Sequence, residues 1–128
     1  MRELRPGLWH WKAPHPEWRA TEPWDPNVSS YAIDDGDRLP FGADVFQGHK
    51  KNDTVLWVES QHAVISGDTL VDFGQGLEIN ERWLRPGVTR EEIAAGLRPL
   101  LGLPVEHVLA THGGPFDRAA LERALSPA

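Results

Sequence analysis

The sequence predicts a single α/β domain with a mixed sheet, and three observations support this fold class. Short apolar runs rich in Val, Ile, Leu and Trp recur through the first half of the chain, which is typical of strands. Two longer amphipathic segments follow, each opened by a capping residue, which is typical of helices. A further apolar run between them adds one more strand to an α+β arrangement. We expect the 128 residues to form one domain, residues 1–128.

The first half is predicted to consist of strands and turns. Large rings alternate at Trp9 and Trp11, which indicates a half-buried edge strand over residues 7–12. The proline-rich stretch after it is excluded from helices and central strands. Three further strands are predicted at residues 28–33, 54–59 and 63–66. The last two are expected to pair as a hairpin.

Two stretches lack a clean hydrophobic period and are predicted loops. The first covers residues 37–50 and follows a strong turn signal at residues 34–36. The second covers residues 69–88, with one expected helical turn near residues 81–83. The six tryptophans of the chain are expected to lie mostly in the core, because burial is the default for such large rings.

The last third opens with a predicted helix. Thr89 and Glu92 form a capping box, in which each side chain can satisfy a free backbone N–H at the start of the helix. Ile93 and Leu97 then lie on one apolar face. Pro99 is expected to end or kink this helix.

A strand and a second helix complete the prediction. Gly102 is the expected C-cap of the first helix. Residues 105–109 form an apolar run and are predicted to be a buried strand. The second helix is expected over residues 116–125, with Asp117 as its cap.

Composition and charge exclude several kinds of partner and site. The net charge is −6 and no tract is rich in lysine or arginine, so we expect no nucleic-acid partner. The chain has no cysteine, which excludes disulfides and thiolate zinc sites. The N-terminus lacks an apolar signal segment, and no apolar run is long enough to span a bilayer. We therefore expect a cytoplasmic protein with no membrane partner.

Three short polar motifs carry the candidate chemistry. They are Gly48-His49, Gly67-Asp68-Thr69 and Thr111-His112-Gly113-Gly114. Each follows or ends an apolar run predicted to be a strand, so the fold decides whether His49, Asp68 and His112 meet at strand ends. Neutral imidazole and carboxylate are standard ligands of zinc-like ions, and such a meeting would form a metal site. Each residue also has a structural alternative. His49 could be an ordinary loop histidine, Asp68 could cap a turn through backbone contacts, and His112 could form a hydrogen bond within a tight turn.

The motifs and their flanks resemble the metallo-β-lactamase fold superfamily. The family motifs P-G-H-T-x-G, G-D-T-L and a late H-G have counterparts in Gln47-Gly48-His49-Lys50, Ser66-Gly67-Asp68-Thr69-Leu70 and Thr111-His112-Gly113-Gly114-Pro115. Residues 4–9 and 27–33 resemble the opening strands of the family, so the likeness covers most of the chain. It implies a shortened metallo-β-lactamase-like layered fold.

This resemblance also implies a metal-dependent hydrolase. His49 would bind one metal ion, His112 would bind a second, and Asp68 would bridge them. The implied metal is zinc, with iron and manganese left open. A metal-bound hydroxide would attack an ester, thioester or similar carbonyl of a small-molecule substrate. Asp68 would be the catalytic residue, since it holds and orients the metal and its water.

One part of the family pattern is missing. The signature H-x-H-x-D-H, which supplies four metal ligands, is absent, and the chain is shorter than the family's domains. A remnant site of His49, Asp68 and His112 would supply the three protein ligands of a single ion. The alternative is a non-catalytic binding or scaffold protein that kept part of the fold. We also expect a homodimer, because loss of a segment exposes an apolar face.

The remaining histidines have structural interpretations. His10 and His15 lie among tryptophans, where packing against rings or exposure to solvent is expected rather than metal binding. His62 falls in a predicted turn and His107 on a predicted strand, and both are expected to be structural or exposed.

Overall fold

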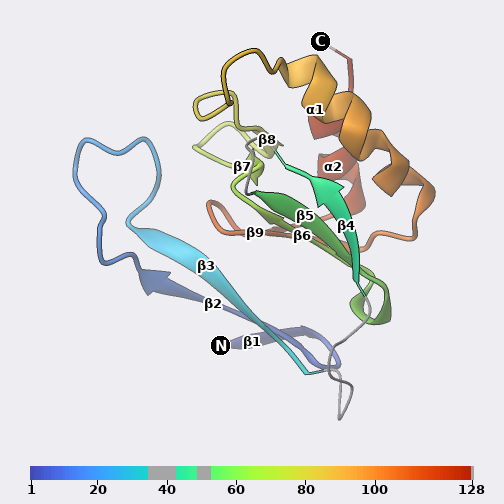
Figure 1. Ribbon diagram of the computed structural model, residues 1–128. Helices are drawn as coiled ribbons and strands as arrows, with labels where there is room; N and C mark the ends of the chain where they lie inside the picture. The colour runs from blue at the N-terminus through green and yellow to red at the C-terminus, as the bar shows by residue number, and fades with distance from the viewer. Residues whose placement is uncertain (35–42, 49–52, 128) are drawn as a thin grey trace.

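In the part of the chain that the structure describes, the fold combines two larger sheets, a short two-stranded ladder and two α-helices (Figure 1). The computed structural model describes residues 1–34, 43–48 and 53–127. Parallel and antiparallel strand pairs occur in the same five-stranded sheet. The predicted α/β class with a mixed sheet is therefore confirmed. Most of the predicted turn at residues 34–36 lies outside the described residues.

The N-terminal sheet has three antiparallel strands in the order β1-β2-β3. They are β1 (Arg2–Arg5), β2 (Leu8–Pro14) and β3 (Asn27–Ile33). Trp9 and Trp11 are half-buried on β2, as the alternation predicts. The prediction of an edge strand is wrong, because β1 pairs with β2 and makes it the central strand. The segment that forms β1 is polar and carries no hydrophobic signal of its own.

The five-stranded sheet has the order β10-β9-β6-β5-β4. Its strands are β4 (Ala43–Gln47), β5 (Thr54–Val58), β6 (Ala63–Gly67), β9 (His107–Ala110) and β10 (Pro115–Phe116). The hairpin of β5 and β6 is confirmed, with a short 3₁₀ helix, η1 (Glu59–Gln61), at its turn. The loop prediction is wrong at β4, where pairing with β5 recruits the segment as an edge strand.

A small ladder replaces part of the second predicted loop. Strands β7 (Leu70–Val71) and β8 (Glu78–Ile79) pair with each other. Leu70 and Ile79 are both buried in the main core, and this burial draws the two segments together. The expected helical turn near residues 81–83 is wrong, because residues 82 and 83 form a non-helical turn.

The first helix follows its predicted signals closely. In α1 (Arg90–Leu97), Thr89 Oγ1 accepts the Glu92 N–H at 3.2 Å and Glu92 Oε2 accepts the Thr89 N–H at 2.9 Å. The capping box is therefore confirmed. The α-helix gives way before Pro99 to a 3₁₀ helix, η2 (Arg98–Gly102). The C-cap prediction is wrong, because the C-cap of α1 is Arg98 and Gly102 is the last residue of η2.

The second helix is α2 (Arg118–Leu125), and its predicted cap is confirmed. Asp117 Oδ1 accepts the Ala120 N–H at 2.9 Å. Among the described residues, no helix has the length and apolar character needed to cross a lipid bilayer.

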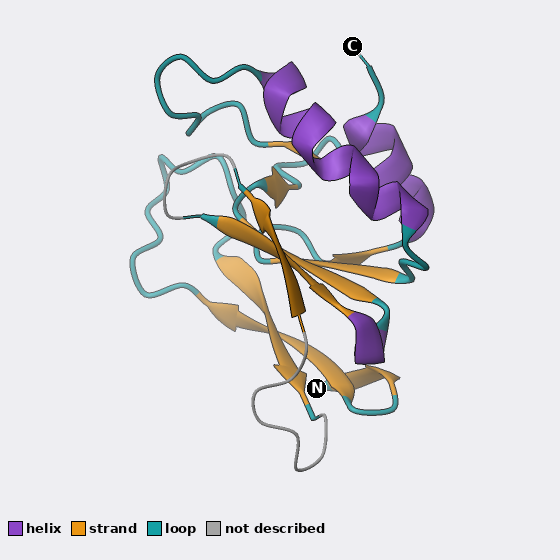
Figure 2. Cartoon of the chain, turned by 45° about the vertical axis from the view of Figure 1, so that its right-hand side comes forward, coloured by secondary structure: helices purple, strands orange, loops and turns teal. Residues whose placement is uncertain are grey.

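The elements stack as helices, five-stranded sheet and N-terminal sheet (Figures 1 and 2). Side chains alternate along a strand, and β6 shows both faces in use. Val64 packs in the cluster on the helix side, whereas Ala63 and Ile65 pack against Leu8 on the side of the N-terminal sheet. The five-stranded sheet is therefore the middle layer.

The tryptophans depart from the sequence prediction. Trp24 and Trp57 are buried, but the other four are only half-buried. Trp9 and Trp11 lie on the face of β2 opposite Leu8, because side chains alternate along the strand. They are thus directed away from the layer that buries Leu8.

Candidate functional site

Asp68 and His112 come together at the ends of two neighbouring strands. Strands β6 and β9 run parallel, so their carboxyl ends meet at one edge of the sheet. Asp68 follows β6 directly, and His112 lies two residues beyond β9. The structure places His112 Nε2 3.4 Å from Asp68 Oδ1. The Asp68 side chain is 36% exposed and that of His112 only 7%.

The third predicted ligand, His49, lies outside the described residues. Its neighbour Gly48 is described, and the Gly48 N–H donates to the Asp53 carbonyl at 2.9 Å. A Cβ at position 48 would lie 2.6 Å from Thr69 Oγ1 and 2.7 Å from the Asp53 carbonyl oxygen. Only glycine fits this close approach. The first motif therefore contacts the second motif where Gly48 packs beside Thr69.

Asp53 is a site-edge residue that the sequence reasoning missed. Its Oδ2 accepts a hydrogen bond from Thr69 Oγ1 at 2.5 Å. The bond links the start of β5 to the residue after Asp68. Asp53 lies in a segment with no motif, so no sequence signal identified it.

Three aromatic rings surround His112. Their centroids lie 4.7 Å (Trp24), 5.8 Å (Phe73) and 6.1 Å (Trp83) from the centroid of the imidazole. His112 Nδ1 is buried and has no hydrogen-bond partner in the described part of the chain. Aromatic packing therefore holds the ring, with Nε2 as the nitrogen directed at Asp68. Sequence reasoning missed these rings, although all three stand in segments rich in aromatic and turn residues.

The backbone around His112 is fixed at three consecutive carbonyls. The Ser29 N–H donates to the Thr111 carbonyl at 2.8 Å, and Ser29 Oγ donates to the Gly113 carbonyl at 3.1 Å. The Asp72 N–H donates to the His112 carbonyl at 2.9 Å. Ser29 on β3 thus holds both neighbours of His112. The N-terminal sheet therefore positions the imidazole.

A second contact of the N-terminal sheet lies next to this one. His10 Nε2 is 2.9 Å from Ser29 Oγ, whose hydrogen is already donated to Gly113, so His10 donates to Ser29. Tyr31 stacks on His10 at 5.1 Å and donates its hydroxyl to the Ala110 carbonyl at 2.8 Å. Burial lowers the pKa of His10 and raises the pKa of Tyr31. Tyr31 therefore stays a protonated donor.

The other histidines lie apart from Asp68. His15 packs edge-on against Trp24 at 5.0 Å, in line with the prediction of ring packing. His62 takes a left-handed backbone conformation after η1 and lies 3.0 Å from Glu106. His107 lies on β9, and burial lowers its pKa. Among the described residues, no group of three or more His, Asp or Glu side chains is arranged to hold a metal ion.

Comparison with known proteins gave neither a matching family model nor a matching curated protein. The resemblance to metallo-β-lactamases therefore remains a prediction. What the described residues offer is a carboxylate and an imidazole nitrogen facing each other at a strand edge. Such a pair can share a cation or exchange a proton, and a metal site would need at least one further ligand.

Proposed function

We propose that this chain is a shortened metallo-β-lactamase-like hydrolase whose Asp68, His112 and His49 bind one zinc-like ion. The observation that carries the proposal is the 3.4 Å separation of His112 Nε2 and Asp68 Oδ1. Two ligands of a tetrahedral zinc ion, each about 2.0–2.1 Å from it, lie about 3.4 Å from each other. A direct N–H···O hydrogen bond would bring the two atoms to about 2.9 Å. The separation therefore suits two ligands of one ion.

The layers and the site edge support the same proposal. Two sheets stacked under a helical layer are compatible with a metallo-β-lactamase-like fold (Figure 2). Gly48 packs beside Thr69, which brings the residue before His49 next to the residue after Asp68. With His49 as third ligand, a zinc-like ion would have three protein ligands and an open position.

The residues of the chain would have distinct tasks in such a site. Asp68 supplies negative charge and is held by its backbone, since Asn80 Nδ2 donates to the Asp68 carbonyl at 3.1 Å. His112 presents a fixed nitrogen, and the rings of Trp24, Phe73 and Trp83 keep water from its other side. The chemistry that a bound ion supplies is activation of water toward the carbonyl of an ester or thioester.

One feature departs from ordinary metal-binding histidines. Their second ring nitrogen usually donates to a carboxylate or carbonyl, whereas His112 Nδ1 has no partner among the described residues. This observation favours the second candidate, a non-catalytic binding protein that kept the fold. The two candidates differ in turnover, which one set of variants can measure.

Metal content and affinity test the site. The protein would be purified with zinc and manganese available, and its metal content and zinc affinity measured for wild type, Asp68→Asn and His112→Gln. We expect each variant to lose more than the roughly 10–100-fold in affinity typical of losing an outer-shell partner. His15→Gln is the matched control, because it removes a histidine that also packs on Trp24 but lies apart from Asp68. A folded protein that binds no metal would overturn the proposal.

Hydrolysis of a simple aryl ester then separates the two candidates. Metal-dependent turnover that Asp68→Asn abolishes, while the fold is intact, would support the hydrolase. Metal bound without turnover would instead support the non-catalytic alternative.

The predicted homodimer and cytoplasmic location also stay predictions. The mass of the native assembly, measured on the same metal-analysed sample, tests the first. A metal-containing dimer would favour a site completed across two chains. A metal-free monomer would favour a remnant site that has lost its ion.

A further inference from the structure

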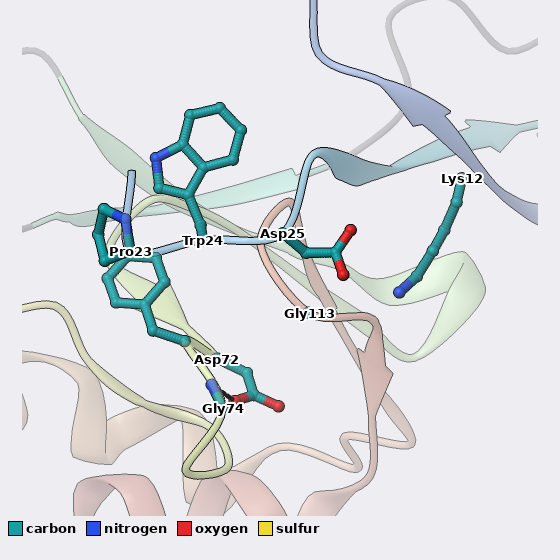
Figure 3. A pocket seen from close by; sticks show the side chains of 8 residues that line it. Lys12, Pro23, Trp24, Asp25, Asp72, Gly74 and Gly113 are labelled. Atoms are coloured by element: carbon teal, nitrogen blue, oxygen red, sulfur yellow. Dashed lines mark hydrogen bonds between the residues drawn. The ribbon is translucent and has the colours of Figure 1, made fainter. Parts of the chain in front are cut away.

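A cavity of about 460 Å³ lies beside the candidate metal site (Figure 3). Its lining comprises Lys12, Pro23, Trp24, Asp25, Asp72, Phe73, Gly74 and Gly113. Trp24 and Phe73 also pack against His112, so the cavity shares a wall with the site. Its volume falls within the range of about 300–1,000 Å³ that is typical of small-molecule binding sites.

Opposite charges face this cavity from different elements. Lys12 extends from β2, and Asp25 extends toward it from the loop before β3 (Figure 3). Lys12 forms no ion pair or hydrogen bond with any described residue, even though two carboxylates line the same cavity. Lys12 is therefore not neutralised by a direct ion pair with either carboxylate.

Each carboxylate is oriented by its own loop. Asp25 Oδ1 accepts the Asn27 N–H at 2.8 Å. Asp72 Oδ1 accepts the N–H of Gly74 at 2.6 Å and that of Gly76 at 3.1 Å. In both residues the second oxygen, Oδ2, accepts no hydrogen bond from the described part of the chain. One acceptor atom on each carboxylate is therefore left for a ligand.

We propose that this cavity binds a zwitterionic amino acid with an apolar side chain. Lys12 takes the ligand carboxylate, Asp25 and Asp72 take the ammonium group, and Trp24 and Phe73 pack against the side chain. A simple anion would face two carboxylates, and a simple cation would face Lys12. Only a ligand that carries both charges complements both the cation and the carboxylates of the lining.

The affinity of this site is expected to be modest. Lys12 is exposed, and charge pairs at exposed positions contribute little. We expect a dissociation constant of about 1 mM or somewhat tighter for a free amino acid. The inference goes beyond the proposed hydrolase function and does not depend on a bound metal.

Calorimetric titration of the metal-free 128-residue chain with L-phenylalanine tests the proposal. Two analogues dissect the charges: 2-phenylethylamine lacks the carboxylate, and 3-phenylpropionate lacks the ammonium group. We expect each analogue to bind about fivefold more weakly than L-phenylalanine, a difference of roughly 1 kcal/mol.

Variants of the charged residues give a crossed pattern. Lys12→Ala is expected to weaken the binding of L-phenylalanine about fivefold. It should not weaken the binding of 2-phenylethylamine, because this variant removes a like charge that faces the amine. Asp25→Asn keeps the acceptor for the Asn27 N–H and is expected to weaken the binding of L-phenylalanine. It should not weaken the binding of 3-phenylpropionate, because it removes a like charge that faces this anion. Arg19→Ala is the matched control. Arg19 is an exposed cation in the loop between β2 and β3, and it does not line the cavity.

Two results would overturn the proposal. One is no detectable binding of L-phenylalanine well above the expected concentration range. The other is equal binding of all three compounds, which would mean that the aromatic wall acts without the charges. Asp68→Asn is expected to retain L-phenylalanine binding, so loss of the metal site and failure of this inference give different results.

Discussion

The two faces of the five-stranded sheet are packed in different ways. Among the described residues, 17 buried side chains form one continuous cluster on the helix side. On the side of the N-terminal sheet, the buried cluster has three members: Leu8, Ala63 and Leu109. Because burial of apolar side chains dominates folding stability, the helix side carries most of it among the described residues.

The N-terminal sheet is instead attached largely through hydrogen bonds. Ser29 and Tyr31 on β3 donate to the Thr111, Gly113 and Ala110 carbonyls, which flank His112. The weakly packed layer is thus joined to the strongly packed layer at the segment that carries the candidate site. Regions with few buried apolar contacts open most readily, so the site lies at a boundary between stable and less stable structure.

The largest expected effects come from a matched pair of leucines, one on each face. Leu121 and Leu8 are both fully buried. Truncation to alanine is expected to cost about 2–5 kcal/mol at each site, because it removes buried methyl groups and leaves a cavity. Leu121→Ala should lower the free energy of unfolding of the whole domain, measured by urea denaturation. Leu8→Ala should instead release the N-terminal sheet alone.

Amide hydrogen exchange distinguishes these outcomes. For Leu8→Ala we expect faster exchange in β1, β2 and β3, with the amides of α1 and α2 little changed. Equal acceleration in the helices would mean that both faces unfold as one unit, and the contrast between the layers would be wrong.

A smaller effect is expected from the hydroxyl that joins the layers. Ser29→Ala leaves the Ser29 N–H bond to Thr111 in place but removes the hydroxyl between His10 and Gly113. Loss of partners for these groups should cost about 1–3 kcal/mol. It should also shift the NMR signals of the His112 ring, because the carbonyl after His112 loses its donor.

Ser30→Ala is the control for this prediction. Ser30 neighbours Ser29 on β3 but lies on the opposite face of the strand, across from Trp11. We expect little change in stability and none in the His112 signals. An equal shift of those signals in both variants would contradict a positioning role for Ser29.

Much of the candidate site could be predicted from the sequence, because it depends on strand ends. The apolar runs of β6 and β9 were evident, and the residues that follow them, Asp68 and His112, do lie together. The rings around His112 could not be predicted in the same way. Trp24 and Trp83 come from irregular segments, whose contacts depend on tertiary packing rather than on a local period.

The missed strands have a related explanation. Strands β1 and β4 are edge strands, and each exists because a neighbouring strand offers backbone partners. Their own residues carry no alternating apolar pattern strong enough to predict a strand. The helix starts were predicted more accurately, because the caps Thr89 and Asp117 bind backbone groups only three positions away.

The smallest predicted effect is a pH dependence that also differs between the layers. Burial lowers the pKa of both His10 and His107. At His10 the positive charges of Lys12 and Arg2 lower the pKa further. At His107 the negative charge of Glu106 opposes the shift. In the unfolded chain each histidine titrates near pH 6.5. Below that pH the unfolded chain binds protons that the folded chain does not, so stability falls as pH drops through 6.5 toward the folded pKa. Each histidine contributes at most about 1.4 kcal/mol per pH unit.

Substitution of one histidine at a time assigns this dependence to a layer. His107 lies in the five-stranded sheet, so His107→Gln should reduce the slope of global unfolding free energy between about pH 5 and pH 7. His10 lies in the N-terminal sheet, so His10→Gln should flatten the pH dependence of amide exchange in β2 and β3 instead. The hydrogen bond with His62 lowers the pKa of Glu106, so this carboxylate loses its stabilising effect only at lower pH, where it becomes protonated. Glu106 therefore contributes little to the slope between about pH 5 and pH 7. If His10→Gln changed the global slope as much as His107→Gln, the N-terminal sheet would be as firmly joined to the core as the helices are.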